Sequence, residues 1–408
     1  MKKLILAIAL LPLTVFAKSI VYDNSVKSLQ VVVNDDWLSP PVMSLNKGDV
    51  LHIGFDQLSH DYHRYIYHVE HCEYDWAPSE EIFESDWLVG FNDNPINDSE
   101  PSLNTTVLYT HYQLQIPDER CRLKMSGNYR LHIIDEESDE EVIRVEFRVV
   151  EPLMNVGLSV TSNTDIDVNA SHQQVSMTVN YNSIRVTNPQ EQVKTIVMQN
   201  GREDTWKQEV RPNYTTPQGL RWEHNRQLIF DGGNEYHKFE VLDVSHPTLG
   251  IDRISWDGTN YQAFPFVDAP RRNYVYDEDA DGAFIIRNSD NIDIDRTCDY
   301  VYVNYKLQPV RHYEGALLLV DGAWATGPME DYVMTYDESD QSYNATILLK
   351  QGYYSYQYVL RDLDGTTHSL PEEGSFYETE NRYQALVYYK GTGERTWRLT
   401  GYQQIVFK

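Results

Sequence analysis

Cysteine is scarce in this 408-residue sequence, which contains only Cys72, Cys121 and Cys298. Three thiols are too few for a disulfide framework, because one bridge would leave one thiol over. A bridge between Cys72 and Cys121 would close a loop of about 50 residues and contribute about 4 kcal/mol. We prefer the interpretation that all three are free, buried thiols, and this bridge is the alternative.

Basic residues are also few, with 34 Lys and Arg against 62 Asp and Glu, and the formal net charge is −28. Such an acidic surface repels nucleic acid and anionic membrane faces. We therefore expect no nucleic-acid partner. The acidic run at 135–141 (DEESDEE) is predicted to be a solvated hairpin tip, since like charges cannot share a buried site.

Long hydrophobic runs are missing after the first residues. Lys2 and Lys3 precede an apolar segment at 4–13, and Ala17 offers a small residue for cleavage. Residues 1–17 are therefore predicted to be a signal peptide, with no cysteine following it for a lipid anchor. No later run approaches the roughly 20 residues of a membrane-spanning helix, so we expect an exported protein that does not insert directly into the membrane.

Helical periodicity is missing as well. Short runs that alternate polar and apolar residues, such as 29–33 and 142–150, are separated by turn-forming clusters such as 46–49. The sequence therefore predicts an all-β chain of tandem β-sandwiches, immunoglobulin-like or early-set-like. We divide the mature chain into three units in a rod, at 18–152, 153–272 and 273–408.

Catalytic motifs of the common hydrolases, metalloproteases and nucleotide-binding enzymes are not found. The stretch HVEHCEYDW at 68–76 suggests a metal site or a nucleophile at first sight. In a strand, however, His68 and Cys72 share one face and His71 lies on the other, so three ligands do not converge. We expect no catalytic residue, no metal ligand, no cofactor and no small-molecule substrate.

An acidic loop is the sharper metal candidate. Asp277, Asp279 and Asp281 have the spacing that begins a calcium loop, but Asn288 stands where a bidentate Glu is needed. A hairpin turn closed by Asp281 and Gly282 is the preferred interpretation.

What the sequence does contain is aromatic residues, including 30 Tyr, and short motifs spread along the mature chain. The motifs stand at 65–72 (YIYHVEHC), 75–76 (DW), 78–79 (PS), 88–91 (LVGF), 102–105 (SLNT), 109–112 (YTHY), 126–129 (SGNY), 188–189, 199–202, 233–236, 373–381, 386–389 and 399–402. In this order they resemble the plug protein family of the type IX secretion system of Bacteroidetes. The sequence departs from the family at Glu73-Tyr74, where Asn-Ala is usual, and at Trp87, which takes the place of a Tyr.

The resemblance implies a non-enzymatic periplasmic protein at the inner face of the outer membrane. Its partner would be the large outer-membrane β-barrel translocon, whose periplasmic mouth it closes when no cargo is in transit. Trp76, Trp87 and Phe91 follow a strand expected to be buried, and loop aromatics of this kind are candidates for partner contact.

Three alternatives remain at this stage. A periplasmic glycan-binding protein would use the C-terminal sandwich, with Trp324, Tyr354 and Tyr356 stacking on sugars. A secreted cargo protein of the same system is suggested by the C-terminal GYQQIVFK. A hydrolase would require convergent polar side chains in a deep pocket.

Overall fold

The structure is a computed structural model that describes residues 19–408, so the predicted signal peptide at 1–17 lies outside the described residues. Antiparallel strands dominate, and every helical segment has three or four residues. The predicted all-β fold of several sandwiches is confirmed. Within 19–408, no helix has the length and apolar character needed to cross a bilayer.

Lobe 1 is a sandwich of two main sheets built from residues 19–152. One sheet has the order β1-β12-β11-β5-β7 with β3 beside β12, the other has the order β2-β4-β9-β8, and β10 pairs with β6. The elements are β1 (Ile20–Val21), β2 (Val26–Val33), β3 (Val42–Ser44), β4 (Leu51–Gln57), β5 (Tyr65–Cys72), α1 (Glu84–Trp87), β6 (Leu88–Gly90), β7 (Asn94–Pro95), β8 (Asp98–Pro101), β9 (Thr110–Ile116), β10 (Cys121–Leu123), β11 (Gly127–Asp135) and β12 (Glu140–Val150). The acidic run at 135–141 joins β11 to β12, as predicted.

Lobe 2 combines residues 155–231 with the end of the chain. Its sheets have the orders β13-β14-β18-β17, with β19 beside β14, and β16-β15-β30-β31. The elements are β13 (Asn155–Thr161), β14 (His172–Asn180), α2 (Pro189–Gln192), β15 (Val193–Gln199), η1 (Glu203–Thr205), β16 (Lys207–Gln208), β17 (Tyr214–Thr216), β18 (Gly219–Trp222), η2 (Arg226–Leu228), β19 (Ile229–Asp231), β30 (Asn381–Tyr389) and β31 (Arg398–Phe407).

Lobe 3 lies between these two parts in the sequence. Its sheets have the orders β20-β28-β23, with β25 and β29 beside β28, and β21-β22-β24-β27-β26. The elements are β20 (His237–Val241), β21 (Ile251–Trp256), β22 (Tyr261–Pro265), β23 (Phe284–Ile286), α3 (Ile294–Thr297), β24 (Tyr300–Leu307), β25 (Ala316–Asp321), η3 (Met329–Tyr332), β26 (Thr335–Asp337), β27 (Ser342–Lys350), β28 (Gly352–Asp362) and β29 (Thr367–Ser369).

Strand pairing crosses the predicted boundary between 153–272 and 273–408. β15 pairs with β30 over seven residues, and β20 pairs with β28. Alternation predicts where a strand lies but not which distant strand it joins, so a contiguous division was the simplest expectation. We propose instead that lobe 3 is inserted within lobe 2.

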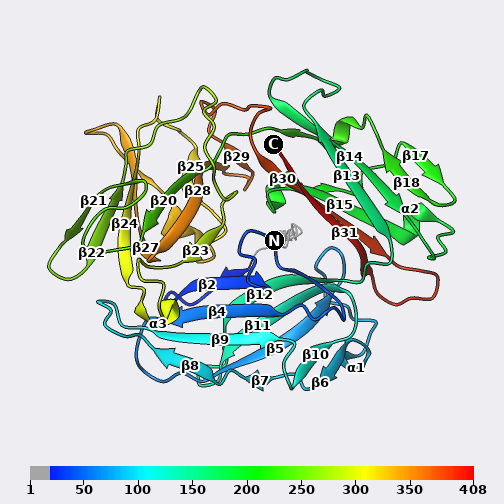
Figure 1. The fold of residues 1–408 in the computed structure, drawn as a ribbon, viewed down its shortest axis with the longest axis horizontal. Coiled ribbons are helices and arrows are strands. Elements are labelled where there is room, and N and C mark those ends of the chain that lie inside the picture. The colour runs from blue at the N-terminus through cyan, green and yellow to red at the C-terminus, as the bar shows by residue number, and fades with distance from the viewer. Residues whose placement is uncertain (1–18) are drawn as a thin grey trace, which may run out of the picture.

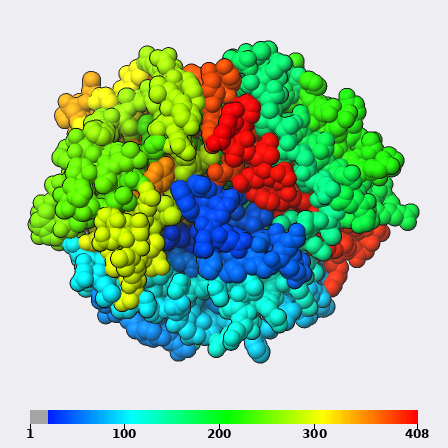
Figure 2. Space-filling model, viewed as in Figure 1, coloured from blue at the N-terminus to red at the C-terminus, as the bar shows by residue number. Residues whose placement is uncertain are grey.

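The three lobes surround a common centre rather than forming the expected rod (Figure 1). Lobe 1 contacts lobe 2 through β12 and β31, and it contacts lobe 3 through β2 and β27. Lobe 2 contacts lobe 3 through an ion pair between Arg382 and Asp281. Figure 2 shows the first described residues, in blue, and the last strand, in red, meeting near the middle of one face.

Candidate functional site

The stretch 68–76 belongs to β5 and the loop that follows it. The four odd-numbered residues of β5 (Tyr65, Tyr67, Val69 and His71) are buried, so the predicted division of faces is confirmed. His71 is bonded to the Ser79 hydroxyl at 2.8 Å, and burial lowers its pKa to about 4. His68 turns outward to Asp93 at 2.9 Å. The two histidines thus have separate local partners.

The three cysteines are free and buried. Cys72 lies near the Glu70 carboxylate, whereas Cys121 lies in the core of lobe 1 near Tyr67. The alternative bridge between Cys72 and Cys121 is therefore not formed. Cys72 ends β5 of the first sheet, whereas Cys121 belongs to β10, which pairs with β6 in a separate two-stranded sheet. Burial raises the pKa of each thiol, which makes the thiolate and its chemistry unfavourable.

The candidate partner residues separate into two groups. Trp76 and Trp87 are 2% and 6% exposed, so neither reaches the surface. Trp87 packs on His71 and Tyr129, whereas Trp76 lies under two arginines. Phe91 is 73% exposed. Sequence alone did not distinguish these cases, because a loop aromatic can fold back onto its own lobe.

Phe91 belongs to an exposed apolar surface at one edge of lobe 1. Phe83 is 72% exposed and Val89 is 40% exposed, and we call these three side chains the 83–91 surface. Gly90 allows β6 to approach β10 closely: its φ is +114°, and a Cβ would lie 1.8 Å from the carbonyl oxygen of Arg120. Asn92, which follows Phe91, donates to the Glu84 carboxylate, which follows Phe83, at 3.1 Å, so the two ends of this surface are held near each other.

The acidic loop 277–282 lies at a small cavity of about 200 Å³ to which all three lobes contribute. Asp277 pairs with Lys238 at 2.5 Å, and Asp279 accepts hydrogen bonds from the amides of Tyr236 and Asp281. These internal partners occupy the carboxylates that a calcium loop would need. Within 19–408, no three His, Cys, Asp or Glu side chains are arranged to hold a metal ion.

Burial changes the protonation of this loop. It raises the pKa of Asp279 to about 7, with Asp281 and Glu235 adding repulsion. It also raises the pKa of Asp281 to about 6, although Arg382 acts in the opposite direction. The loop is therefore a titrating part of the contact between lobes 2 and 3.

The three aromatics considered for sugar stacking are core residues of lobe 3. Trp324 is 6% exposed, and its indole N–H donates to the carbonyl of Ser355 at 3.0 Å. Tyr356 donates to Asp268 at 2.7 Å, and Tyr354 is 2% exposed. They form no open platform for a sugar. Trp324 and Tyr354 do contribute to the wall of a cavity of about 410 Å³ between lobe 3 and the first strands of lobe 1.

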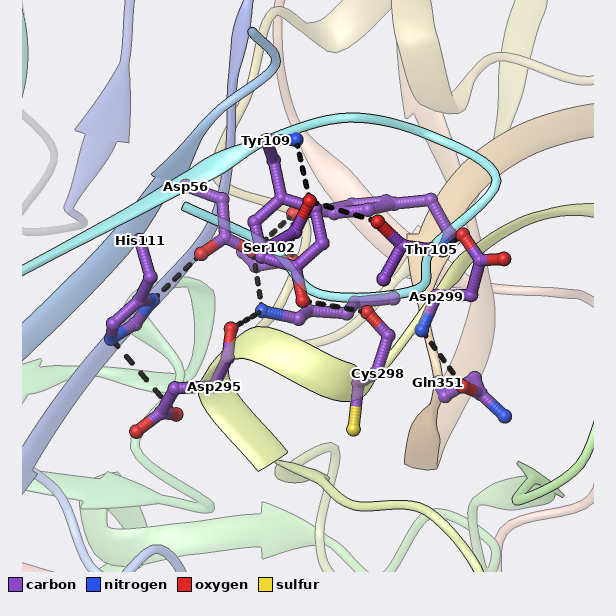
Figure 3. Close-up of polar contacts among 12 residues, drawn as sticks. Asp56, Ser102, Thr105, Tyr109, His111, Asp295, Cys298, Asp299 and Gln351 are labelled. Carbon is purple, nitrogen blue, oxygen red and sulfur yellow. Dashed lines mark hydrogen bonds and ion pairs between the residues drawn. The ribbon is translucent and has the colours of Figure 1, made fainter. Parts of the chain in front are cut away.

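The most extensive polar site is the junction of lobes 1 and 3 (Figure 3). At its centre, Lys350 of lobe 3 and Asp56 of lobe 1 form an ion pair at 2.7 Å, with side chains 2% and 1% exposed. Asp56 also accepts from Tyr300 at 2.7 Å and contacts His111 at 2.7 Å. Lys350 donates to the carbonyl of Asp295 and lies 4.1 Å from the ring of Tyr109.

Backbone contacts extend this junction. Asp299 of lobe 3 accepts from the amides of Thr106 and Val107 at 2.8 and 3.2 Å, and Tyr109 donates to the carbonyl of Cys298 at 2.8 Å. Both oxygens of Asp56 are satisfied by buried partners. The side chains around Asp56 and Lys350 therefore hold the two lobes together, and Asp56 has no free oxygen to accept a hydrogen bond from a substrate. Sequence analysis missed it, because Asp56 and Lys350 stand 294 residues apart.

Comparison with known proteins finds a described domain family for lobe 1. A sequence profile described as "Type 9 secretion system plug protein 1st domain" matches residues 26–151, which is nearly all of lobe 1. No curated protein matches.

A solved structure is similar to nearly the whole chain. The crystal structure of a hypothetical protein from Parabacteroides merdae is 34% identical, covers 96% of this chain and 99% of its own, and has a TM-score of 0.91. The C-terminal domain of an antigen I/II-family protein from Streptococcus pyogenes is also found, with 8% identity, coverage of 94% and 99%, and a TM-score of only 0.18. Over residues 26–151, the chain belongs to the family of the first domain of type IX secretion system plug proteins.

Proposed function

We propose that this protein is a non-enzymatic periplasmic plug that closes the periplasmic mouth of the type IX outer-membrane translocon when no cargo is in transit. Membership of the plug family is the observation that carries the proposal. The family indicates a role in type IX secretion at the cell envelope, and the translocon as partner is the further step proposed here.

The joined lobes support this role. A very large β-barrel encloses a wide aqueous lumen, which leaks unless something blocks it. A cap for such an opening must keep its shape when it is unbound. The ion pair between Lys350 and Asp56 fixes lobe 1 to lobe 3, and the contact of β12 with β31 fixes lobe 1 to lobe 2. A three-lobed body held in this way is wider than a rod of the same sandwiches.

We propose the 83–91 surface as one contact with the barrel. Exposed aromatic side chains anchor many protein interfaces, and charged residues at the rim keep an interface reversible. Glu84 follows Phe83 in the sequence, Asp86 accepts from the Phe83 amide at 2.9 Å, and Arg395 lies 5.7 Å from the Phe83 ring. A mixed surface of this kind suits a plug that must leave when cargo arrives.

Affinity purification from detergent-solubilised outer membrane tests the function. We expect a tagged protein to recover one very large β-barrel protein, identified by mass spectrometry. Export to the periplasm is tested in the same cells by fractionation. Failure to recover a barrel protein from intact, detergent-solubilised complexes would contradict the proposal.

A double variant, Phe83→Glu with Phe91→Glu, tests the contact surface separately. We expect recovery of the barrel to fall about tenfold or more, because two apolar anchors are replaced by charges. Tm is expected to stay unchanged, since both side chains are exposed. The matched control is Leu363→Glu, which changes a residue of lobe 3 that is 92% exposed. Equal losses in the control would rule out a specific role for the 83–91 surface.

A further inference from the structure

One half of β27 has no strand on one of its two sides. β24 pairs with β27 along 343–350, but β26 covers the opposite side only at 342–344. In an antiparallel ladder, every second residue turns its N–H and C=O away from a given neighbour. Among residues 19–408, no backbone hydrogen bond to 346–349 is found other than those with β24. We call the segment 346–349 the free edge of β27.

The course of the chain just before β26 creates this free edge. Backwards from Thr335, the chain turns toward β25 instead of following β27. The Met334 amide donates to the carbonyl of Leu318 at 2.8 Å, and Val333 bridges Leu319 of β25. Before them, η3 contacts β27 but forms no ladder with it. The chain therefore does not supply the neighbouring strand that the free edge lacks.

The cavity of about 410 Å³ between lobes 1 and 3 runs along the free edge. All four residues of 346–349 line this cavity, although successive side chains of a strand point to opposite faces. The cavity therefore borders the edge of β27 and not one of its faces. Another wall comes from Val26, Lys27 and Ser28 of β2, a strand of lobe 1 that contacts β27 (Figure 1). Four extended residues span about 13 Å, so the free edge matches a short strand.

The two strand edges at this cavity differ in how well they are protected from pairing. β2 is the last strand of its sheet, but its register shifts between Lys27 and Gln30, and Lys27 carries a charge. Bulges and lysines are devices that keep edge strands from pairing. The free edge of β27 has the sequence TILL, without charge, proline or glycine. We therefore expect β27, and not β2, to accept a further strand.

The inner wall of the cavity indicates which side chains fit there. A residue directly opposite Ile347 or Leu349 in an antiparallel pair shares their face of the sheet. That face belongs to the core of lobe 3, where Trp324, Tyr354 and Phe284 line the cavity. Apolar side chains at alternate positions of an added strand would therefore pack on aromatic rings.

The outer part of the cavity carries more negative than positive charge. Lys27 pairs with Asp331 at 3.2 Å, and their side chains are 21% and 38% exposed. Glu330 lines the same cavity and is exposed, and in the described part of the chain it is found in no ion pair. Two carboxylates against one cation favour a basic residue in a bound segment.

We propose that an extended segment of a partner protein, with apolar residues at alternate positions and a basic residue at one end, adds to β27 along 346–349. Its backbone supplies the hydrogen bonds that the free edge lacks, and its apolar side chains fill the cavity. Because β2 forms another wall, the bound segment also strengthens the junction of lobes 1 and 3. This site is separate from the 83–91 surface, so either proposal can fail without the other.

Peptide selection on the full-length mature protein tests the free edge. A displayed library of short random peptides is selected on the wild type and, in parallel, on Thr326→Trp, which places a large ring in the cavity wall. We expect only the wild type to enrich peptides with alternating apolar residues and a Lys or Arg. The control Thr259→Trp carries the same ring on an exposed turn of lobe 3 and should enrich the same peptides as the wild type. Equal enrichment on Thr326→Trp, or no enriched peptide on the wild type, would overturn the proposal.

N-methylation of an enriched synthetic peptide tests the backbone pairing without changing the protein. Only alternate amides of an added strand face β27. We expect methylation of one alternate set to weaken binding to the wild type by about tenfold or more, and methylation of the other set to have little effect. Fluorescence anisotropy measures both affinities. The proposal is wrong if the losses do not alternate. It is also wrong if the wild type self-associates and Thr326→Trp does not, because the free edge then binds a second copy of this chain.

Discussion

At the scale of single residues, burial and pairing decide the role of each polar group. Cys72 and His71 occur in a stretch that suggests metal chemistry, but both side chains are buried in lobe 1. Asp56 and Lys350 stand in unremarkable strands, yet they form the buried ion pair of a lobe junction. Residue type and spacing predicted that the stretch with Cys72 and His71 forms no metal site, because strand alternation places its side chains on two faces. They did not predict the buried ion pair, because the two partners meet only in the folded chain.

Replacing Lys350 with methionine tests the importance of this pair. We expect Lys350→Met to reduce the free energy of unfolding by about 3–5 kcal/mol, because it leaves the Asp56 carboxylate buried without its cation. Urea unfolding followed by tryptophan fluorescence measures the change. The double variant with Asp56→Asn should recover part of the loss, since no uncompensated charge remains.

A surface lysine of the same lobe provides the control for this prediction. Lys306 pairs with Asp340 where both side chains are partly exposed, at 35% and 42%. Lys306→Met is expected to cost less than about 1 kcal/mol. Similar losses for Lys350→Met and Lys306→Met would mean that the junction pair adds no special stability.

At the scale of elements, alternation located strands but not their neighbours. β30 lies within the predicted third unit at 273–408. It pairs with β15 and completes lobe 2, where Tyr383, Ala385 and Val387 are fully buried. A half-buried strand shows the same pattern whichever lobe it joins.

Truncation after Glu378 tests whether lobe 2 needs the end of the chain. The truncated chain lacks β30 and β31, so β15 becomes an unpaired edge and the lobe 2 core is opened. We expect limited proteolysis to cut rapidly within 155–231, while 237–369 of lobe 3 resists.

The matched control for this truncation keeps the full chain. Val406→Ser changes a side chain of β31 that is 42% exposed, and protease resistance should stay as in the wild type. Persistent resistance of 155–231 in the truncated chain would show that lobe 2 folds without β30 and β31.

At the scale of the whole molecule, three lobes meet around an acidic cavity, and this makes stability depend on pH. The pKa of Asp279 is raised to about 7 in the folded protein. A raised pKa contributes stability that is present below the unfolded value of about 4 and is lost as pH rises through about 7. The contact between lobes 2 and 3 should therefore be stronger in mild acid than at pH 8.

Asp279→Asn removes this titration. We expect the Tm of the wild type to fall between pH 5 and pH 8 by about 2 °C or more relative to that of the variant, because only the wild type ionises a buried carboxyl in this range. At pH 5 the variant is expected to be the less stable protein, because an amide has one oxygen to accept the N–H groups of Tyr236 and Asp281, which the carboxyl accepts with two. Calorimetric scans of both proteins at the two pH values measure it. A Tm difference independent of pH would contradict the assigned titration.

The sequence by itself determined the fold class, the two faces of β5, the hairpin tip at 135–141 and the family, because each depends on local alternation, turn residues or short motifs. Only the tertiary structure decided the course of the chain from lobe 2 through lobe 3 and back, the burial of Trp76 and Trp87, and the exposure of Phe91. It also brought Lys350 to Asp56. The physical reason is that pairing and burial depend on groups that are distant in sequence, and local patterns carry no information about which of them will meet.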